Sequence, residues 1–378
     1  MTDMRRVHLA IVLCLTSLVA GCSTLAQRNS TGVVVARRAQ IRSSTAVVAA
    51  DLLQVNRGDQ VDILETTDVP DPNDNTRKER WLRVKAHDED ATEGWIEARN
   101  VMPDDVLESA KKLAAEDAGI PAQARGQLRA SSNLRLTPDR GGNDNIMMRL
   151  DSGSSFDIVS WKRVPKPKAS EAIETDVAPK AGSAQPGARS NRQGDEANEP
   201  EETNELWYKV RLPPEISPAP AGWIYGKQVE LAVPSDIIFY RTGREFVAWQ
   251  RLDGDARDTA NASSDKDEGR EAKPGSWLIL EKSSSNQPHS LDEPDFDRIY
   301  VLGYDKRGQE HYTAYRSPDV NGYLPARVTG QGDNRSFVVR IQDESGGVKD
   351  TQYSLYKDAR GILKVSAPNV APRDRRRR

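Results

Sequence analysis

The segments "RWLRVKA" (80–86) and "EGWIEARNV" (93–101) recur later in the chain as "LWYKVRL" (206–212) and "AGWIYGKQV" (221–229), in the same order. Such self-similarity indicates two copies of one structural unit. In both copies β-branched and aromatic residues partly alternate with polar residues, a pattern typical of short strands. Because about 60 residues of such strands are too few for a flat sheet with a free face, each copy predicts a small closed or half-open barrel.

The parts of the two copies that precede these segments also align, with Arg42 on Arg135 and Gly58 on Gly153. The arginines are expected to tie a loop to a carboxylate or a backbone carbonyl, and the glycines are expected to be turn residues. The second copy is longer because of an insertion at 165–205, which is rich in Pro, Ala, Gly, Ser and Glu. That composition predicts a disordered segment.

Together these features resemble the bacterial SH3 (SH3b) pattern, which has an N-x-R-x-x-P start, a Gly before a V-x-V-L strand, a W-x-K-V strand and a closing G-W-V. The second copy fits better, since the first has Gln40 in place of Asn and Thr45 in place of Pro. The resemblance implies two SH3-like barrels, at 34–102 and 124–233. It also implies a groove between loops that binds short peptides, often from the cell wall.

Aromatic residues are the candidate ligand contacts of such a groove. Trp81 and Trp207 are expected in the core, as large aromatics on strands usually are. The candidates for ligand binding are Trp95, Tyr208, Trp223 and Tyr225.

The start of the chain has the features of an export signal. Arg5 and Arg6 precede an apolar run at 7–20, which is shorter than the about 20 residues that a membrane-spanning helix needs. The "LVAGC" that follows resembles the lipobox of bacterial lipoproteins, which implies removal of residues 1–21 and acylation of Cys22. An ordinary secreted or inner-membrane-anchored protein is the alternative.

This resemblance implies a protein of the cell envelope that faces the periplasm and is held to a membrane by the lipid on Cys22. Residues 22–33 would then be a tether. Ser23 favours the outer over the inner membrane, because in such lipoproteins Asp at this position retains the protein at the inner membrane. Cys14 lies inside the signal, so neither a disulfide nor a cysteine nucleophile is expected.

The rest of the chain is divided into a helix, a third region and a tail. Residues 103–123 predict a helical linker with Asp105 near its start and Pro121 after its end. Residues 234–367 contain eight strand-like segments joined by turns such as "DKRG" and "DARG", which predicts an all-β meander that forms a barrel or sandwich. Residues 368–378 form a basic tail that could be attracted to anionic lipids or polymers. The fold class expected is therefore mainly β, with two SH3-like barrels joined by a short helix and a C-terminal all-β domain.

Nothing in the sequence indicates catalysis. The histidines outside the signal are His87, His289 and His311, which the sequence does not cluster as zinc ligands. Glu281 and Glu310, which lie near the ends of predicted strands, are a candidate pair of carboxylates. We expect no enzyme, no cofactor and no metal site, and the net charge of −3 gives no reason to expect nucleic-acid binding.

Two functions are compatible with this pattern. The first is a module that binds peptidoglycan peptides through its SH3b-like domains. The second is a protein–protein adaptor or assembly factor in an envelope complex.

Overall fold

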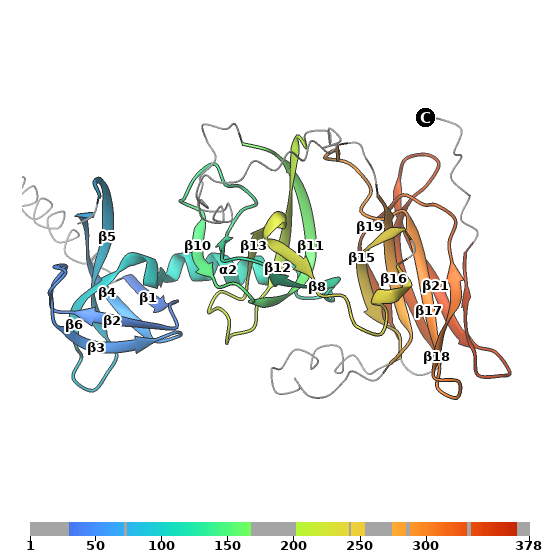
Figure 1. Ribbon diagram of the computed structural model, residues 1–378, viewed down its shortest axis with the longest axis horizontal. Coiled ribbons are helices and arrows are strands. Elements are labelled where there is room, and N and C mark those ends of the chain that lie inside the picture. The colour runs from blue at the N-terminus through green and yellow to red at the C-terminus, as the bar shows by residue number, and fades with distance from the viewer. Residues whose placement is uncertain are drawn as a thin grey trace, which may run out of the picture. The chain divides into compact units, whose positions relative to one another are not determined.

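The computed structural model describes seven stretches of the chain, which are residues 30–71, 74–167, 202–241, 243–253, 274–284, 288–330 and 334–368 (Figure 1). Within them the protein is mainly β, with curled antiparallel sheets and one α-helix. The chain divides into two compact units, with the boundary after Glu108. Several predicted features lie outside the described residues, namely the signal peptide at 1–21, Cys22, insertion residues 168–201 and tail residues 369–378.

The first unit contains a seven-stranded sheet of order β3-β2-β6-β5-β4-β1-β7. Its strands are β1 (Ser30–Val34), β2 (Arg38–Arg42), β3 (Asp51–Asn56), β4 (Gln60–Asp71), β5 (Asp74–Ala86), β6 (Glu93–Glu97) and β7 (Val101–Pro103). Strand β1 includes residues 30–33, which the sequence pattern assigns to the tether. The pattern misses this strand because backbone pairing with β4 and β7 forms it. A Cβ at Gly32 would lie 2.8 Å from a methyl carbon of Val101, so the close approach of β1 and β7 needs glycine.

The second sheet has the order β10-β9-β13-β12-β11-β8-β14, which is the order of the first sheet strand for strand. Its strands are β8 (Ala124–Leu128), β9 (Ser132–Arg135), β10 (Ile146–Leu150), β11 (Ser155–Pro165), β12 (Asn204–Arg211), β13 (Ala221–Tyr225) and β14 (Val229–Leu231). Strands β11 and β12 pair out to Pro165 and Asn204. Both ends of the predicted insertion at 165–205 are therefore strand, because backbone pairing extends the hairpin beyond the apolar pattern.

The two sheets also agree in detail. Trp95 lies opposite Arg42 across β6 and β2, and Trp223 lies opposite Arg135 across β13 and β9. Arg42 donates to two backbone carbonyls of the β2–β3 loop, at 2.7 and 3.2 Å. Arg135, which is completely buried, donates to a carbonyl and to Asn145 Oδ1 of the β9–β10 loop, at 2.7 and 2.6 Å. The predicted role of both arginines in holding a loop is confirmed.

The turn glycines are confirmed as well. Gly58 and Gly153 have φ angles of 93° and 82°, which residues with a Cβ rarely adopt. They occupy equivalent turns, before β4 in the first sheet and before β11 in the second. The aligned sequence segments therefore correspond to the same backbone in both sheets.

The single α-helix of the described residues, α2, runs from Asp104 to Glu116. The predicted start is confirmed, but the helix ends well before Gln123. Its last turn is held to β12, where Lys209 Nζ lies 2.8 Å from Glu116 Oε2 and 2.5 Å from Asp117 Oδ2. The residues after Glu116 form turns and then an extended segment, in which Gln123 bonds to a residue far along the chain. The helical pattern of the sequence does not show this change.

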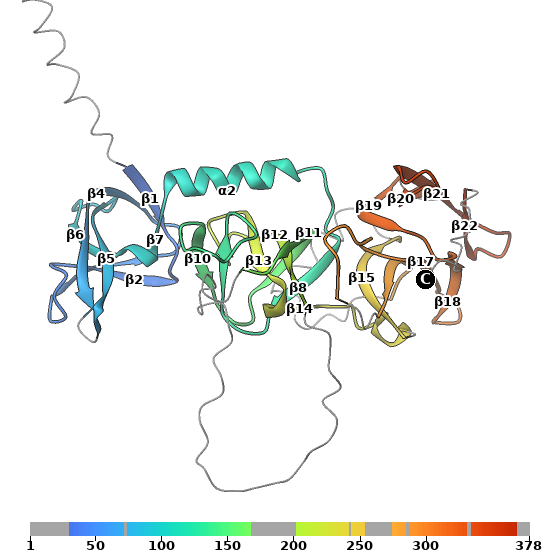
Figure 2. The same cartoon turned by 90° about the horizontal axis from the view of Figure 1, so that it is seen from above.

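The C-terminal strands form two four-stranded antiparallel sheets, each a simple meander (Figure 2). The first comprises β15 (Arg244–Arg251), β16 (Trp277–Ser283), β17 (Arg298–Asp305) and β18 (Glu310–Arg316). The second comprises β19 (Gly322–Thr329), β20 (Arg335–Gln342), β21 (Val348–Lys357) and β22 (Leu363–Ser366). The eight strand-like segments predicted here all contain strands.

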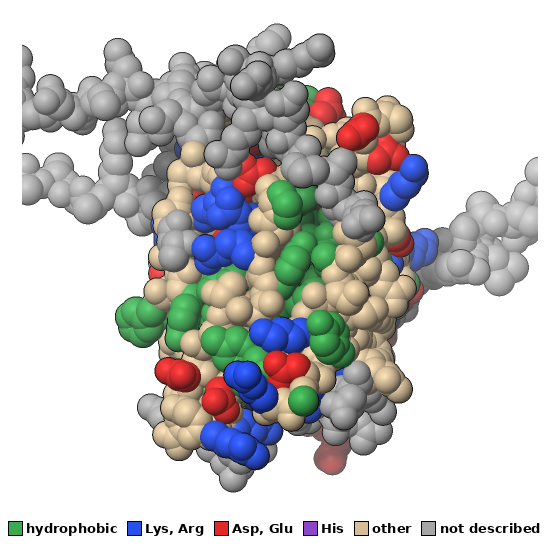
Figure 3. Space-filling model, turned by 90° about the vertical axis from the view of Figure 1, so that its right-hand side faces the viewer, with side chains coloured by type: hydrophobic (Ala, Val, Ile, Leu, Met, Phe, Trp, Pro, Cys, Tyr) green, Lys and Arg blue, Asp and Glu red, His purple; other side chains and the backbone are tan. Residues whose placement is uncertain are grey.

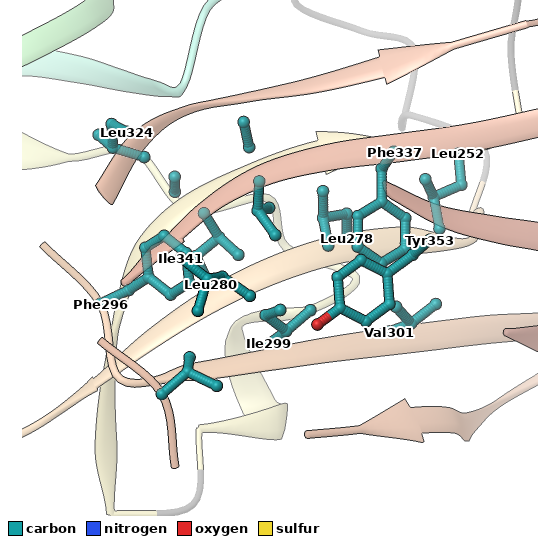
Figure 4. Close-up of a cluster of buried hydrophobic side chains, with 14 of the residues drawn as sticks. Leu252, Leu278, Leu280, Phe296, Ile299, Val301, Leu324, Phe337, Ile341 and Tyr353 are labelled. Carbon is teal, nitrogen blue, oxygen red and sulfur yellow. The ribbon is translucent and has the colours of Figure 1, made fainter. Parts of the chain in front are cut away.

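One hydrophobic cluster lies between these two sheets (Figure 4). Leu280 and Val301 from the first sheet meet Phe337 and Tyr353 from the second, and all four are fully buried. The Phe337 and Tyr353 rings stack at 4.8 Å between centroids. Such a shared core binds the two sheets into one body.

Side chains bridge the seams between the two sheets. At Ala326 the pairing of β19 with β20 is irregular, which leaves its backbone groups for other partners. Gln123 donates to Ala326 O at 3.0 Å and accepts from Ala326 N–H at 2.7 Å, while Gln250 of β15 donates to the same oxygen at 2.8 Å. At the other seam, Tyr312 of β18 accepts from Leu363 N–H at 2.6 Å.

Gln123 also connects the second sheet to the C-terminal sheets, because β8 follows it directly. Trp161 of β11, which like Gln123 precedes the C-terminal sheets in the sequence, also packs against their core cluster. The residues that the sequence divides between 124–233 and 234–367 therefore belong to one compact unit.

Candidate functional site

Two of the four candidate ligand contacts line the same cavity. Tyr208 and Tyr225 both line a cavity of about 400 Å³ in the second unit. Trp223 does not line it, although it shares strand β13 with Tyr225, and Trp95 belongs to the first unit. Trp95 and Trp223 are both half-buried and occupy equivalent register positions. The cavity is therefore built around the two tyrosines and not around the two tryptophans.

The other two repeat tryptophans are core residues, as predicted. Trp81 is 5% exposed and Trp207 is completely buried. The Trp207 and Tyr225 ring centroids are 5.6 Å apart, so the core tryptophan supports one wall of the cavity.

Trp161 is a cavity residue that the sequence does not reveal. Its ring stands edge-on to Tyr208, with 6.1 Å between centroids, and its indole N–H donates to Asp295 Oδ1 at 2.6 Å. Asp295 also accepts from Leu324 N–H at 2.9 Å, and burial raises its pKa. Comparison of the two copies passes over Trp161 because it follows the last aligned residue of its strand, where the only signal is one aromatic residue in "VSWKRV".

The cavity has a fixed charged wall on the side of the second sheet. Arg140 Nε lies 3.0 Å from both carboxylate oxygens of Glu205, and its Nη2 lies 2.5 Å from one of them. The Glu205 side chain is only 1% exposed. The Arg140 guanidinium also lies 5.0 Å from the centre of the Tyr225 ring, a distance at which cation–π attraction operates. These contacts hold the Tyr225 ring in place before any ligand binds.

A second charged wall comes from β16 and the segment after it. Lys282 Nζ lies 2.8 Å from one oxygen of Glu293, and His289 Nδ1 lies 2.7 Å from the other. Burial lowers the pKa of Lys282. Burial acts to raise the pKa of Glu293, but its hydrogen bonds with Lys282 and His289 outweigh this and hold the pKa below its usual value.

The hydroxyl of Tyr208 stays protonated over the physiological range, because burial raises its pKa to about 12. It can therefore both donate and accept a hydrogen bond. Arg163, Lys227 and Glu245 supply further charges to the lining. The cavity thus offers aromatic surface, a neutral hydroxyl and charges of both signs.

The structure does not assemble the carboxylate pair considered from the sequence. Glu281 pairs with Arg298 at one end of β17, and Glu310 pairs with Asp305 at its other end. At about 3.3 Å per residue, the two carboxylate positions are about 23 Å apart along the sheet. The two catalytic carboxylates of glycosidases lie within about 10 Å of each other, so the candidate carboxylate pair at Glu281 and Glu310 is wrong.

The histidines bond separately. His87 lies 3.1 Å from Asp62, His289 contacts Glu293, and His311 Nε2 lies 2.9 Å from Gly275 O. Within the described stretches, His, Cys, Asp and Glu side chains form no group of three or more that could hold a metal ion. Within these stretches no helix has the length and hydropathy to span a membrane.

Comparison of the chain with protein-family models and with curated proteins gives no match in either case.

Proposed function

We propose that this protein is a non-catalytic lipoprotein of the bacterial cell envelope, anchored through a lipid on Cys22, whose SH3b-like domains bind peptides of peptidoglycan. The observation that carries the proposal is that Tyr208 and Tyr225, chosen from the SH3b resemblance, line one cavity. In this proposal the two seven-stranded sheets are SH3b-like barrels. Their support is the shared strand order and the shared position of the loop-holding arginines.

The lining of the cavity suits a short peptide. Its volume of about 400 Å³ lies within the range of about 300–1,000 Å³ of small-ligand sites. Stem peptides carry both carboxylates and an amine, and the lining carries both cations, such as Arg163 and Lys227, and an anion, Glu245. Aromatic rings held by neighbours, as Tyr225 is by Arg140, bind with little loss of side-chain entropy.

The C-terminal sheets belong to the proposal as an all-β barrel that supports one side of the cavity. Its support is the pair of seams, where Gln250 and Tyr312 bond the edge strands of one sheet to those of the other. Asp295 and Lys282 of this barrel line the cavity, so the SH3b-like domain and the barrel would bind ligand together.

Co-sedimentation with purified sacculi tests the proposal. The chain from residue 23 onward should pellet with sacculi, and Tyr208→Ala should weaken binding about tenfold, because a lost ring contact is worth about 1.4 kcal/mol. The matched control is Trp95→Ala with Trp223→Ala, which changes aromatic residues outside the cavity and should leave binding within about twofold. No pelleting would refute the function, whereas loss in the tryptophan variant alone would refute the cavity as its site.

The anchor is tested separately. Cys22→Ser should release the protein from the membrane fraction, and an intact Cys22 with Ser23 should place it with the outer membrane on density separation. Recovery of the Cys22→Ser protein in the membrane fraction would contradict lipid anchoring.

A protein–protein adaptor is the second candidate, and the β2–β3 loop favours it. Val47 and Val48 at the tip of this loop are 69% and 94% exposed, although Arg42 holds the loop in place. Apolar side chains that are exposed to water on a loop held in place are typical of protein–protein interaction sites. Crosslinking in cells followed by mass spectrometry distinguishes the candidates, since one dominant protein partner supports the adaptor and wall fragments support peptidoglycan binding.

A further inference from the structure

Two hairpin turns of the C-terminal sheets have the same sequence pattern, Asp-x-Arg-Gly. The first is "DKRG" at 305–308, between β17 and β18, and the second is "DARG" at 358–361, between β21 and β22. In each turn the aspartate Oδ1 accepts the backbone N–H of the arginine two residues later, at 2.9 Å in both cases. These bonds hold the backbone of Arg307 and Arg360 and leave their guanidinium groups exposed.

The two turns come from different sheets, yet both line one cavity of about 350 Å³. The cavity lies at one end of the pair of sheets, where β15, β17 and β21 finish and β16, β18, β20 and β22 begin. Figure 3 views a face of the C-terminal sheets, on which Lys and Arg side chains lie beside hydrophobic and acidic ones.

Positive charge dominates the lining. The cationic residues are Lys306, Arg307, Arg335, Lys357 and Arg360, against two carboxylates. Both carboxylates are bonded within the protein, since Asp253 Oδ1 accepts from Ser276 N–H at 2.8 Å and Asp305 holds its turn. Among the ion pairs of the described residues, none involves Lys306, Arg307 or Arg360.

Aromatic and apolar residues form another part of the lining. Tyr304, Tyr312 and Tyr356 line the cavity, and Tyr312 is fixed by Leu363 N–H. A Cβ at residue 303 would lie 2.4 Å from the Tyr312 ring, so Gly303 is what lets that ring lie across β17. Tyr356 is 50% exposed and offers an open ring face.

We propose that this cavity is a binding site for a phosphate ester carried on a sugar or glycerol unit. Guanidinium groups match phosphate oxygens in paired hydrogen bonds, and the lining of this one cavity includes two of them, those of Arg307 and Arg360. A phosphate monoester carries a charge of about −1.5 to −2, which suits this excess of cations better than a single carboxylate does. The tyrosines would contact the carbon skeleton of the ligand.

Calorimetric titration of the full-length protein in detergent with glycerol 3-phosphate tests the site. The unaltered protein should bind, and Arg307→Gln with Arg360→Gln should weaken binding by at least about tenfold per guanidinium removed. Because the turns use backbone N–H groups, these substitutions should leave the fold intact, which amide hydrogen exchange of β17–β22 would verify. The matched control is Arg149→Gln with Arg327→Gln, which removes the same charge from exposed strand positions outside the cavity and should change binding less than about twofold.

A second arm distinguishes the sources of the phosphate. Flotation with phosphatidic acid vesicles, against phosphatidylcholine vesicles, detects a phosphate monoester in a lipid headgroup, and binding of glycerol 3-phosphate without vesicle binding indicates a soluble or polymer-borne ester. Either result supports the site if the variant with Arg307→Gln and Arg360→Gln no longer binds the same probe. Failure of both probes to bind, or equal loss in the control variant, would overturn the proposal. Sacculus binding through the Tyr208 cavity can fail or succeed independently, because Tyr208 does not line this site.

Discussion

Gln123→Met is expected to loosen the seam between β15 and β19. The substitution keeps the length and shape of the side chain but removes its bonds to Ala326, at 3.0 Å and 2.7 Å, and its bond to the nearby Pro121 O, at 2.8 Å. Gln123 is completely buried, so the Ala326 N–H is left without a partner where water does not reach it. The Ala326 oxygen still accepts from Gln250 at 2.8 Å, so one orphaned donor is the main loss.

An orphaned buried donor costs about 1–3 kcal/mol, and we take about 2 kcal/mol for this one. At 1.4 kcal/mol for each factor of ten, amide hydrogens whose exchange requires opening of this seam should exchange about 30-fold faster. Hydrogen exchange with mass spectrometry on peptides that cover Gly322–Gln342 measures this directly. Peptides from β4 and β5 of the first unit should not change.

Gln352→Met is the matched control, because Gln352 is exposed on β21 and its side chain donates to Ser336 Oγ, at 3.1 Å, at the surface. It should change exchange by less than about threefold. Combining Gln123→Met with Gln250→Met should cost more than the two single changes together, since only the pair deprives the Ala326 oxygen of both glutamine donors. Acceleration of less than threefold in Gln123→Met would refute the bridging role of the glutamines.

Three further predictions concern stability. Arg140→Met should lower the free energy of unfolding by about 3–5 kcal/mol in urea denaturation, because it leaves Glu205 buried and unpaired. Adding Glu205→Leu should restore part of the lost free energy of unfolding, and no restoration would count against the ion pair. Gly94→Ala and Gly222→Ala should each lower the free energy of unfolding by about 1–3 kcal/mol. The new Cβ would lie 2.5 Å from a backbone oxygen at residue 94 and 2.6 Å from a leucine methyl at residue 222, and unchanged denaturation midpoints would contradict this. Burial raises the pKa of Glu281, although the charges of neighbouring arginines act to lower it. The folded state therefore holds the carboxyl proton of Glu281 more tightly than the unfolded state does, and stability is lost as pH rises through the folded pKa. Glu281→Gln, which cannot ionise, should therefore gain stability relative to the unaltered protein as the pH rises above 4.5, the usual pKa of the carboxyl, and a gain that does not grow with pH would be inconsistent with a buried ionisable carboxyl.

Much of the secondary structure was accessible from sequence because its determinants are local. Alternation of polar and apolar residues indicated the strands of the C-terminal sheets, and turns such as "DKRG" and "DARG" indicated their hairpins. The repeat was also visible, because Gly58 and Gly153 need a backbone conformation that few other residues adopt. The strand at Ser30–Val34 was missed because it has little apolar pattern and forms by backbone pairing alone.

The candidate site was only partly accessible, for a related reason. Tyr208 and Tyr225 were selected by resemblance, but nothing local showed that Trp223 lies outside their cavity or that Trp161 completes it. Trp161 meets Asp295 across 134 residues of sequence. No periodicity extends over such a separation.

By itself the sequence determined most of the strands, the start of the helix, the repeated unit and the positions of the hairpin turns, since each depends on neighbours along the chain. Only the tertiary structure decided which side chains meet: Gln123 with Ala326 across 203 residues, Tyr208 with Trp161, and the turn of Arg307 with the turn of Arg360. The physical reason is that strand pairing of β11 with β12 brings Tyr208 to Trp161, whereas packing of the two C-terminal sheets on one core sets the other distances. That packing depends on the sum of many burial contacts that no single motif encodes.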